Sequence, residues 1–210
     1  MNDLIVDELV VRRGTYELSA RNIVIGANGI TLIVGDNGSG KSTILDVLAG
    51  RRRADSLLSG GRTLRQRELR GRSAYLSEGR FAMDEFTVSQ AVSLARVFFG
   101  RFQTARFEVA IGEAGLSPTR PVGSYSSGEQ RLLDALLVLH SGRELVLIDE
   151  AFAHLDGSRK TFLKSKINEI RTQSAVVLAT QHADALEPAP AGVVTYEILN
   201  ESGKAWVQKC

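Results

Sequence analysis

The sequence predicts an α/β fold in which a mostly parallel sheet is covered by helices. Short apolar segments alternate with segments of helical periodicity, which is the pattern of such folds. Leu145–Ile148 is apolar at every position, as in a strand buried on both faces. A glycine-rich segment, Gly35–Ser42, stands between an expected strand and an expected helix. The 210 residues fit one domain of this kind.

The first 50 residues predict three strands and a helix. Leu4–Val11, Tyr16–Ile25 and Ile30–Val34 combine apolar and β-branched residues between turn residues. Lys41–Ala49 carries apolar residues at helical spacing, and Gly50 follows it as a C-terminal stop.

The middle of the chain predicts a long loop and three helices. Residues 51–72 are rich in arginine and lack apolar periodicity, so we expect a loop there, ending in a short strand at Ser73–Ser77. Two of the helices begin with capping-box pairs, Thr87 with Gln90 and Ser126 with Glu129. The three helices are Thr87–Phe98, Ala105–Ala114 and Ser126–Leu139.

The last third of the chain continues the alternation after the buried strand Leu145–Ile148. A helix is expected at Ser158–Arg171, followed by a strand at Ala175–Ala179. Val193–Leu199 and Ala205–Gln208 predict a terminal pair of strands.

Charge and composition exclude several kinds of protein. The formal charge is +2, so no overall positive field recruits nucleic acid or an anionic membrane. The one cysteine, Cys210, allows no internal disulfide bond. No apolar run approaches the roughly 20 residues that span a bilayer, and Asp3 and Asp7 stand where a secretory signal would carry basic residues. We therefore expect a cytoplasmic protein that meets a membrane only through a partner.

The segment GDNGSGKST, residues 35–43, satisfies the phosphate-binding pattern G-x-x-x-x-G-K-[ST]. Its glycines allow backbone N–H groups to approach phosphates, and the following helix N-terminus adds positive partial charge. Lys41 is expected to reach the β- and γ-phosphates of ATP, and Ser42 to bind Mg²⁺. The expected nucleotide-binding residues of this loop are Gly35, Asn37, Gly38, Ser39, Gly40, Lys41, Ser42 and Thr43.

The segment ELVLIDE, residues 144–150, predicts a buried strand that ends in two acids. Ligands of parallel sheets bind at the C-terminal ends of the strands. Asp149 is therefore expected to hold Mg²⁺, and Glu150 to orient or deprotonate an attacking water. A buried strand often ends in an acid for structural reasons, but the phosphate-binding loop upstream favours the catalytic interpretation.

Three further segments give the chain a pattern that resembles the ABC (ATP-binding cassette) ATPases. SYSSGEQRLL, residues 124–133, resembles the family's signature motif LSGGQ, and AHLD, residues 153–156, resembles its D-loop. His182, after the segment AVVLA, resembles its switch histidine. The resemblance covers nearly the whole chain. It implies a P-loop NTPase (RecA-like) core at 1–85 and 123–210, with an N-terminal antiparallel β region and an α-helical subdomain inserted at about 86–122.

The resemblance also implies how these residues work. Two domains associate head to tail with ATP and Mg²⁺ between them, and hydrolysis lets them separate. Glu150, His182 and Lys41 are then the expected catalytic residues, with His182 sensing the γ-phosphate. The residues expected to contact ATP across the interface, or to bridge the two sites, are Ser126, Ser127, Gly128, Glu129 and Asp156.

Several positions depart from the family pattern. Glu78 stands at the glutamine position of the Q-loop, where a carboxylate can still bind Mg²⁺ or a water but adds negative charge. The adenine-stacking aromatic is expected near the end of LVVRR, where either Arg13 or Tyr16 can cover a base. The other departures are Tyr125 for Leu, Ser127 for Gly, Glu129 for Gln, Ala151 for Pro and Gln181 for Thr.

Two clusters admit a second interpretation. The arginines of residues 51–72 resemble a nucleic-acid-binding patch, but a solvated face is favoured, and nucleic acid is not an expected partner. The side chains Phe98, Phe99, Phe102 and Phe107 have helical spacing. Packing within the helical subdomain is favoured for most of them over docking of a partner helix.

The leading interpretation is an ATP-hydrolysing subunit of an ABC transporter, at the cytoplasmic face of a membrane through an integral membrane permease subunit. It is expected to form a homodimer, or a heterodimer with another ABC domain. TVSQAVSLARVFFG, residues 87–100, looks like the stretch after the Q-loop in transporter subunits.

Three other classes compete with this interpretation. The first is a soluble ABC ATPase of the RecF and SMC kind, acting in DNA repair or chromosome maintenance. Residues 43–124 contain no sustained heptads such as the long-armed members need. The translation-factor branch normally carries two fused domains, and the intact Lys41, Asp149, Glu150 and His182 argue against an inactive domain.

Overall fold

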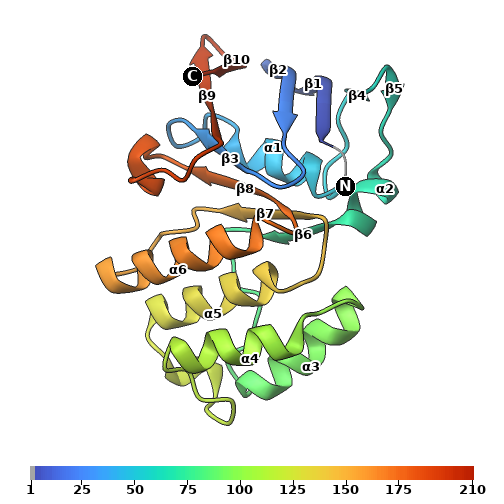
Figure 1. Ribbon diagram of the computed structural model, residues 1–210. Coiled ribbons are helices and arrows are strands. Elements are labelled where there is room, and N and C mark those ends of the chain that lie inside the picture. The colour runs from blue at the N-terminus through green and yellow to red at the C-terminus, as the bar shows by residue number, and fades with distance from the viewer. Residues whose placement is uncertain (1–2) are drawn as a thin grey trace.

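A ten-stranded sheet runs through the computed structural model, which describes residues 3–210 (Figure 1). Met1 and Asn2 lie outside the described residues. They belong to the N-terminal segment in which the sequence predicts no secretory signal. The strand order is β5-β4-β1-β2-β10-β9-β3-β8-β7-β6. The strands are β1 (Leu4–Arg13), β2 (Tyr16–Ile25), β3 (Ile30–Val34), β4 (Ser56–Ser59), β5 (Arg62–Thr63), β6 (Ser73–Leu76), β7 (Leu145–Asp149), β8 (Ala175–Thr180), β9 (Val193–Glu201) and β10 (Lys204–Lys209).

The sheet has a parallel half and a mainly antiparallel half. β3 pairs in parallel with β8 and β9, and β7 pairs in parallel with β6 and β8. β1 is antiparallel to β2 and β4, and β9 is antiparallel to β10. The expected α/β fold with a parallel core and an N-terminal antiparallel region is confirmed.

Helices cover both faces of the parallel half (Figure 1). On one face, α5 (Ser127–Leu139) and α6 (Gly157–Ile170) pack side by side, and α3 (Val88–Phe99) and α4 (Thr104–Glu113) lie beyond them. On the other face, α1 (Lys41–Leu48) is enclosed between the parallel strands and the β1–β2 pair. The division into a core and an inserted helical subdomain stays a prediction. Within residues 3–210, no helix is both long and apolar enough to cross a membrane.

The prediction of a loop over residues 51–72 is wrong. The segment forms β4 and β5, which extend the antiparallel edge of the sheet, and then α2 (Gln66–Arg72). Its buried apolar side chains are Leu57, Leu64 and Leu69. Three such residues spread over this length show no helical or strand periodicity, so the sequence pattern missed the elements.

Arginines of this segment lie at the surface and approach acids. These contacts are the expected behaviour of a solvated charged face, where single ion pairs stabilise a fold only slightly. The pairs are Arg51–Asp46, Arg52–Asp46, Arg62–Glu68 and Arg72–Glu144.

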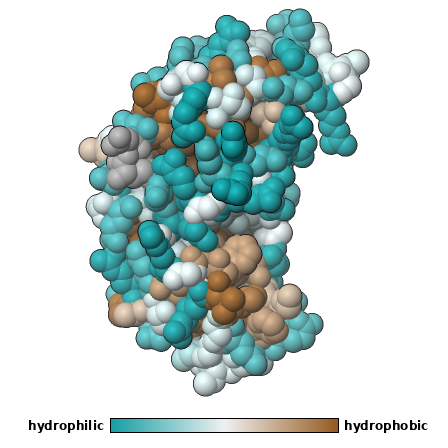
Figure 2. Space-filling view, turned by 90° about the vertical axis from the view of Figure 1, so that its right-hand side faces the viewer, coloured by the Kyte–Doolittle hydropathy of each residue, from teal (hydrophilic) through white to brown (hydrophobic). Residues whose placement is uncertain are grey.

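The phenylalanine cluster of the helical region is partly exposed. Phe99 and Phe107 are buried, as expected, but Phe98 is 68% exposed. The Phe98 and Phe99 rings meet edge to face with centroids 5.2 Å apart. Figure 2 shows apolar side chains gathered on the lower part of the face that carries α3. Val97 of α3 is also exposed.

Candidate active site

The phosphate-binding loop connects β3 to α1 and is held by a side chain from β2. Gly40 is the N-cap of α1 with φ 114°, and a Cβ there would lie 2.5 Å from the Tyr16 hydroxyl, so glycine is required. The Tyr16 hydroxyl donates to the Ser39 carbonyl at 2.9 Å, and burial raises the pKa of Tyr16. Arg13, the other candidate for the adenine contact, is exposed at the end of β1.

Lys41 is the first residue of α1, directly after this loop. Its Nζ donates to the carbonyl oxygens of Gly35 at 2.7 Å and Asp36 at 3.0 Å. It also lies 3.9 Å from a Glu150 carboxylate oxygen, and its side chain is only 5% exposed. A buried ammonium at a helix N-terminus makes a strong site for an anionic group.

A cavity of about 330 Å³ opens beside Lys41 and brings together residues from distant parts of the sequence. Ser42 comes from α1, Asp149 and Glu150 from the end of β7, and Glu78 from the segment after β6. The loop residues that line it are Asn37, Gly38, Gly40 and Thr43, whereas Gly35 and Ser39 line a separate hollow on the side of β9.

Asp149 is the buried acid of this cavity. Burial raises its pKa, and the neighbouring Ser42 hydroxyl and the charge of Lys41 oppose that rise. Tyr75 lies on the neighbouring strand β6, and burial together with the charge of Asp149 raises the pKa of Tyr75. The sequence did not predict that Tyr75 lies near Asp149, because the two residues belong to different strands.

The oxygen atoms of Ser42 and Asp149 fit a magnesium ion. The Ser42 hydroxyl and the Asp149 carboxylate both line the cavity, and Mg²⁺ takes few protein oxygens together with phosphate oxygens and water. The Glu78 charge also acts on Asp149. Among residues 3–210, His, Cys, Asp and Glu form no cluster of three that would hold a metal alone. The donor set therefore suits an ion that arrives with a nucleotide.

Arg131 of α5 joins this site to two backbone segments. Arg131 is 5% exposed, and its guanidinium donates to the carbonyl oxygens of Asp149 and Glu150, and to the Ser77 carbonyl at 3.0 Å. Glu150 has φ 46°, a left-handed conformation that non-glycine residues adopt at a cost. Two hydrogen bonds hold Glu150 in this conformation. Arg131 donates to the Glu150 carbonyl, and the Glu150 N–H donates to the Ala179 carbonyl at 2.9 Å. The only feature of the sequence that could have pointed to Arg131 is its position as a basic residue inside a largely apolar helix.

Arg131→Met is expected to lower the free energy of unfolding by about 2–4 kcal/mol, since several buried carbonyl groups lose their donor. Urea denaturation followed by circular dichroism measures the change. Arg171→Met, at the far end of α6, is the matched control, because Arg171 bonds Asn168 and the Ala191 carbonyl at the surface. Equal stability of the Arg131 and Arg171 variants would contradict this role.

The signature residues lie outside the cavity, at the N-terminus of α5. Ser126 is the N-cap, and its side chain accepts from the Glu129 N–H at 3.3 Å. Glu129 accepts from the Ser126 N–H and hydroxyl at 2.9 and 2.8 Å, which confirms the expected capping box. Gly128 packs on the D-loop, where a Cβ would lie 2.7 Å from the His154 carbonyl oxygen. Ser127 is exposed beside them.

His182 and Asp156 also lie apart from the phosphate cavity. His182 lines a neighbouring hollow of about 530 Å³ that shares Glu150 with it. Asp156 is the N-cap of α6 and accepts from the Arg159 N–H at 2.9 Å and the Ser158 hydroxyl at 2.7 Å. These bonds lower the pKa of Asp156 to about 2.

The phosphate-binding loop at the C-terminal edge of a parallel sheet, with two acids beside it, defines a P-loop NTPase. Residues 18–153 match the family model described as "ABC transporter". The chain is 30% identical to the cytochrome c biogenesis ATP-binding export protein CcmA of Rhizobium johnstonii, over 97% of the chain and 96% of that protein. It is 29% identical to the thiamine import ATP-binding protein ThiQ of a Ruegeria species, over 82% and 78%.

The fold agrees with solved structures of such proteins. One described as the ATP binding subunit of an ABC transporter superposes with a TM-score of 0.76 at 19% identity, covering 97% of this chain and 88% of the other. A nucleotide-free ATP-binding cassette from an ABC transporter superposes equally well, with a TM-score of 0.76 at 18% identity, covering 98% and 90%. The chain belongs to the ABC transporter family, as an ATP-binding subunit. Such subunits are ATPases, so the chain is an enzyme that hydrolyses ATP.

Proposed function

We propose that this chain powers the movement of a substrate through a separate membrane subunit, by ATP-driven association of two ABC domains. The main support for this proposal is that the signature serine does not lie at the cavity that holds the other site residues. Lys41, Ser42, Asp149 and Glu150 meet at one cavity, whereas the signature serine Ser126 lies outside it on an exposed helix N-terminus. A second copy, or a related domain, has to bring its own signature to this cavity.

Each residue of the cavity then has a part in binding or hydrolysis. Loop N–H groups and Lys41 bind the phosphates, and Ser42 and Asp149 hold Mg²⁺, which supplies positive charge to the phosphate oxygens. Glu150 orients or deprotonates the attacking water. Glu78, which lines the same cavity, would bind Mg²⁺ or a water. His182 would sense the γ-phosphate, Asp156 would bridge the two sites, and Arg13 or Tyr16 would cover the adenine.

The partner that carries the substrate is an integral membrane permease subunit, which places this chain at the cytoplasmic face of a membrane. The names of the relatives support a transport role and include both an export and an import protein. They therefore assign neither a direction nor a substrate to this chain. The DNA repair and chromosome-maintenance class is not favoured, because these similar proteins are named as transport components.

Affinity purification of the tagged Glu150→Gln protein with ATP, from gently solubilised membranes of its native host, tests the proposal. We expect a polytopic membrane protein in near-equal amount, identified by mass spectrometry. The Lys41→Ala, Glu150→Gln double variant is the control, and should recover less partner if ATP drives assembly. Recovery of DNA or soluble repair factors with no membrane protein would contradict the transporter role.

A further inference from the structure

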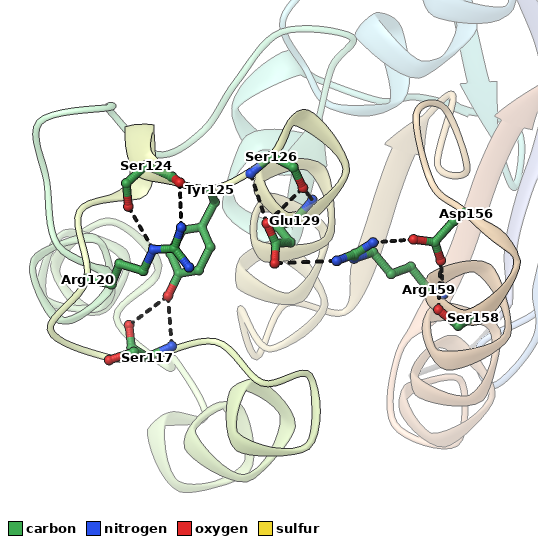
Figure 3. Close-up of polar contacts among 9 residues, drawn as sticks. All are labelled: Ser117, Arg120, Ser124, Tyr125, Ser126, Glu129, Asp156, Ser158 and Arg159. Carbon is green, nitrogen blue, oxygen red and sulfur yellow. Dashed lines mark hydrogen bonds and ion pairs between the residues drawn. The ribbon is translucent and has the colours of Figure 1, made fainter.

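One side chain, Arg159, joins the signature and the D-loop within the chain (Figure 3). Arg159 lies in the first turn of α6, and its guanidinium contacts the Asp156 carboxylate. The same guanidinium lies 3.4 Å from a Glu129 carboxylate oxygen. Glu129 in turn accepts the Ser126 N–H and hydroxyl. A continuous chain of polar contacts therefore runs from Asp156 through Arg159 and Glu129 to the signature serine.

Glu129 places a full negative charge at this point of the signature. The hydrogen bonds from Ser126 hold the pKa of Glu129 below its usual value, so the carboxylate is ionised at neutral pH. In the proposed dimer, Ser126 meets the γ-phosphate of the ATP bound by the second domain. A carboxylate bonded to that serine repels the phosphate, and more strongly once the interface excludes water.

Two cations, Arg120 and Arg159, lie near Glu129, and they are engaged differently. The Arg120 guanidinium donates to the hydroxyl of Ser124 at 2.9 Å and stacks 4.2 Å from the centre of the Tyr125 ring. Arg159 makes the direct contact with Glu129. The Arg159 side chain is 34% exposed, so it remains accessible to an approaching domain.

Close packing around Gly128 brings the N-terminus of α5 next to the D-loop and to Arg159. A Cβ at Gly128 would lie 2.7 Å from the His154 carbonyl oxygen and 4.0 Å from the Arg159 side chain. The N-terminus of α5 and the D-loop are therefore in close contact, which brings the Arg159 side chain near Glu129.

We propose that Arg159 is a positioning residue that makes Glu129 compatible with ATP-dependent association of two domains. It neutralises Glu129 and holds the carboxylate toward α6, away from the incoming γ-phosphate. This inference rests on the proposed function. It makes a specific prediction: the need for Arg159 disappears when the charge of Glu129 is removed.

The test is a double-mutant cycle in the Glu150→Gln protein, with ATP-dependent dimerisation measured by analytical ultracentrifugation. Arg159→Met is expected to weaken dimerisation by about tenfold or more, since a charge is left unpaired at the interface. Arg159→Lys should retain part of the affinity. Adding Glu129→Gln to Arg159→Met should return dimerisation to within about threefold of Glu129→Gln alone. Arg171→Met, at the far end of the same helix, is the control and should have no effect.

Two further measurements separate this role from a structural one. Thermal unfolding shows whether each variant folds, and Arg159→Gln replaces Arg159→Met in the cycle if the methionine variant does not. Binding of a fluorescent ATP analogue to the monomer should be unchanged, because Arg159 lies outside the phosphate cavity. If Arg159→Met weakened dimerisation equally with and without the Glu129→Gln substitution, the inference would be overturned. It would also be overturned if Arg159→Met did not weaken dimerisation. Failure of the parent Glu150→Gln protein to dimerise with ATP would instead remove the proposed function.

Discussion

Glu150→Gln is expected to slow steady-state ATP hydrolysis by about 100- to 10,000-fold, the usual contribution of a general base. The Glu150 carboxylate lines the phosphate cavity and lies 3.9 Å from the Lys41 ammonium. An amide has nearly the same shape but cannot accept a proton from water. The variant should therefore still bind ATP and accumulate in the associated, ATP-bound state. Phosphate release measures the rate, and gel filtration with ATP measures the association.

The chain offers a matched control for this substitution. Glu144 directly precedes the same strand at its opposite end, where it pairs with Arg72 at the surface. Glu144→Gln should therefore hydrolyse ATP at the wild-type rate. A Glu150→Gln protein with wild-type turnover would show that another group activates the water.

Features of this fold that depend on neighbouring residues were predictable from the sequence. The Ser126–Glu129 and Thr87–Gln90 capping boxes both form, because each is complete within four residues. Strands β3 and β7 were likewise visible, since all their side chains except Thr31 and Asp149 are apolar. β4, β5 and α2 were missed because tertiary contacts of three leucines, rather than a local pattern, stabilise them.

The polar network around the site depends on the fold and was only partly predictable. Lys41, Asp149 and Glu150 were found because they fall within motifs. Arg131 was not, since its acceptors lie on the segments after β6 and β7, which only the sheet order makes adjacent to α5. Arg159 was missed for a similar reason, because Glu129 lies 30 residues earlier in the chain and on another helix.

Lys41→Ala is expected to weaken ATP binding by about 100-fold or more, because two or more charge-assisted hydrogen bonds to phosphate are lost. The Lys41 ammonium is fixed in the loop by the Gly35 and Asp36 carbonyls, so it is positioned before the nucleotide arrives. Its removal also leaves Glu150 without its nearby cation and increases repulsion of the phosphates. Titration with a fluorescent ATP analogue measures the affinity.

The control separates a local effect from a change in overall charge. Lys204 is exposed on β10 and does not line the phosphate cavity, so Lys204→Ala removes the same charge without touching the loop. It should leave ATP affinity unchanged, and circular dichroism should show that both variants fold. If Lys41→Ala bound ATP as tightly as Lys204→Ala, the loop would not be the phosphate site. The acids that line the cavity would then have no anion to act on, and the assignment of Glu150 would be lost as well.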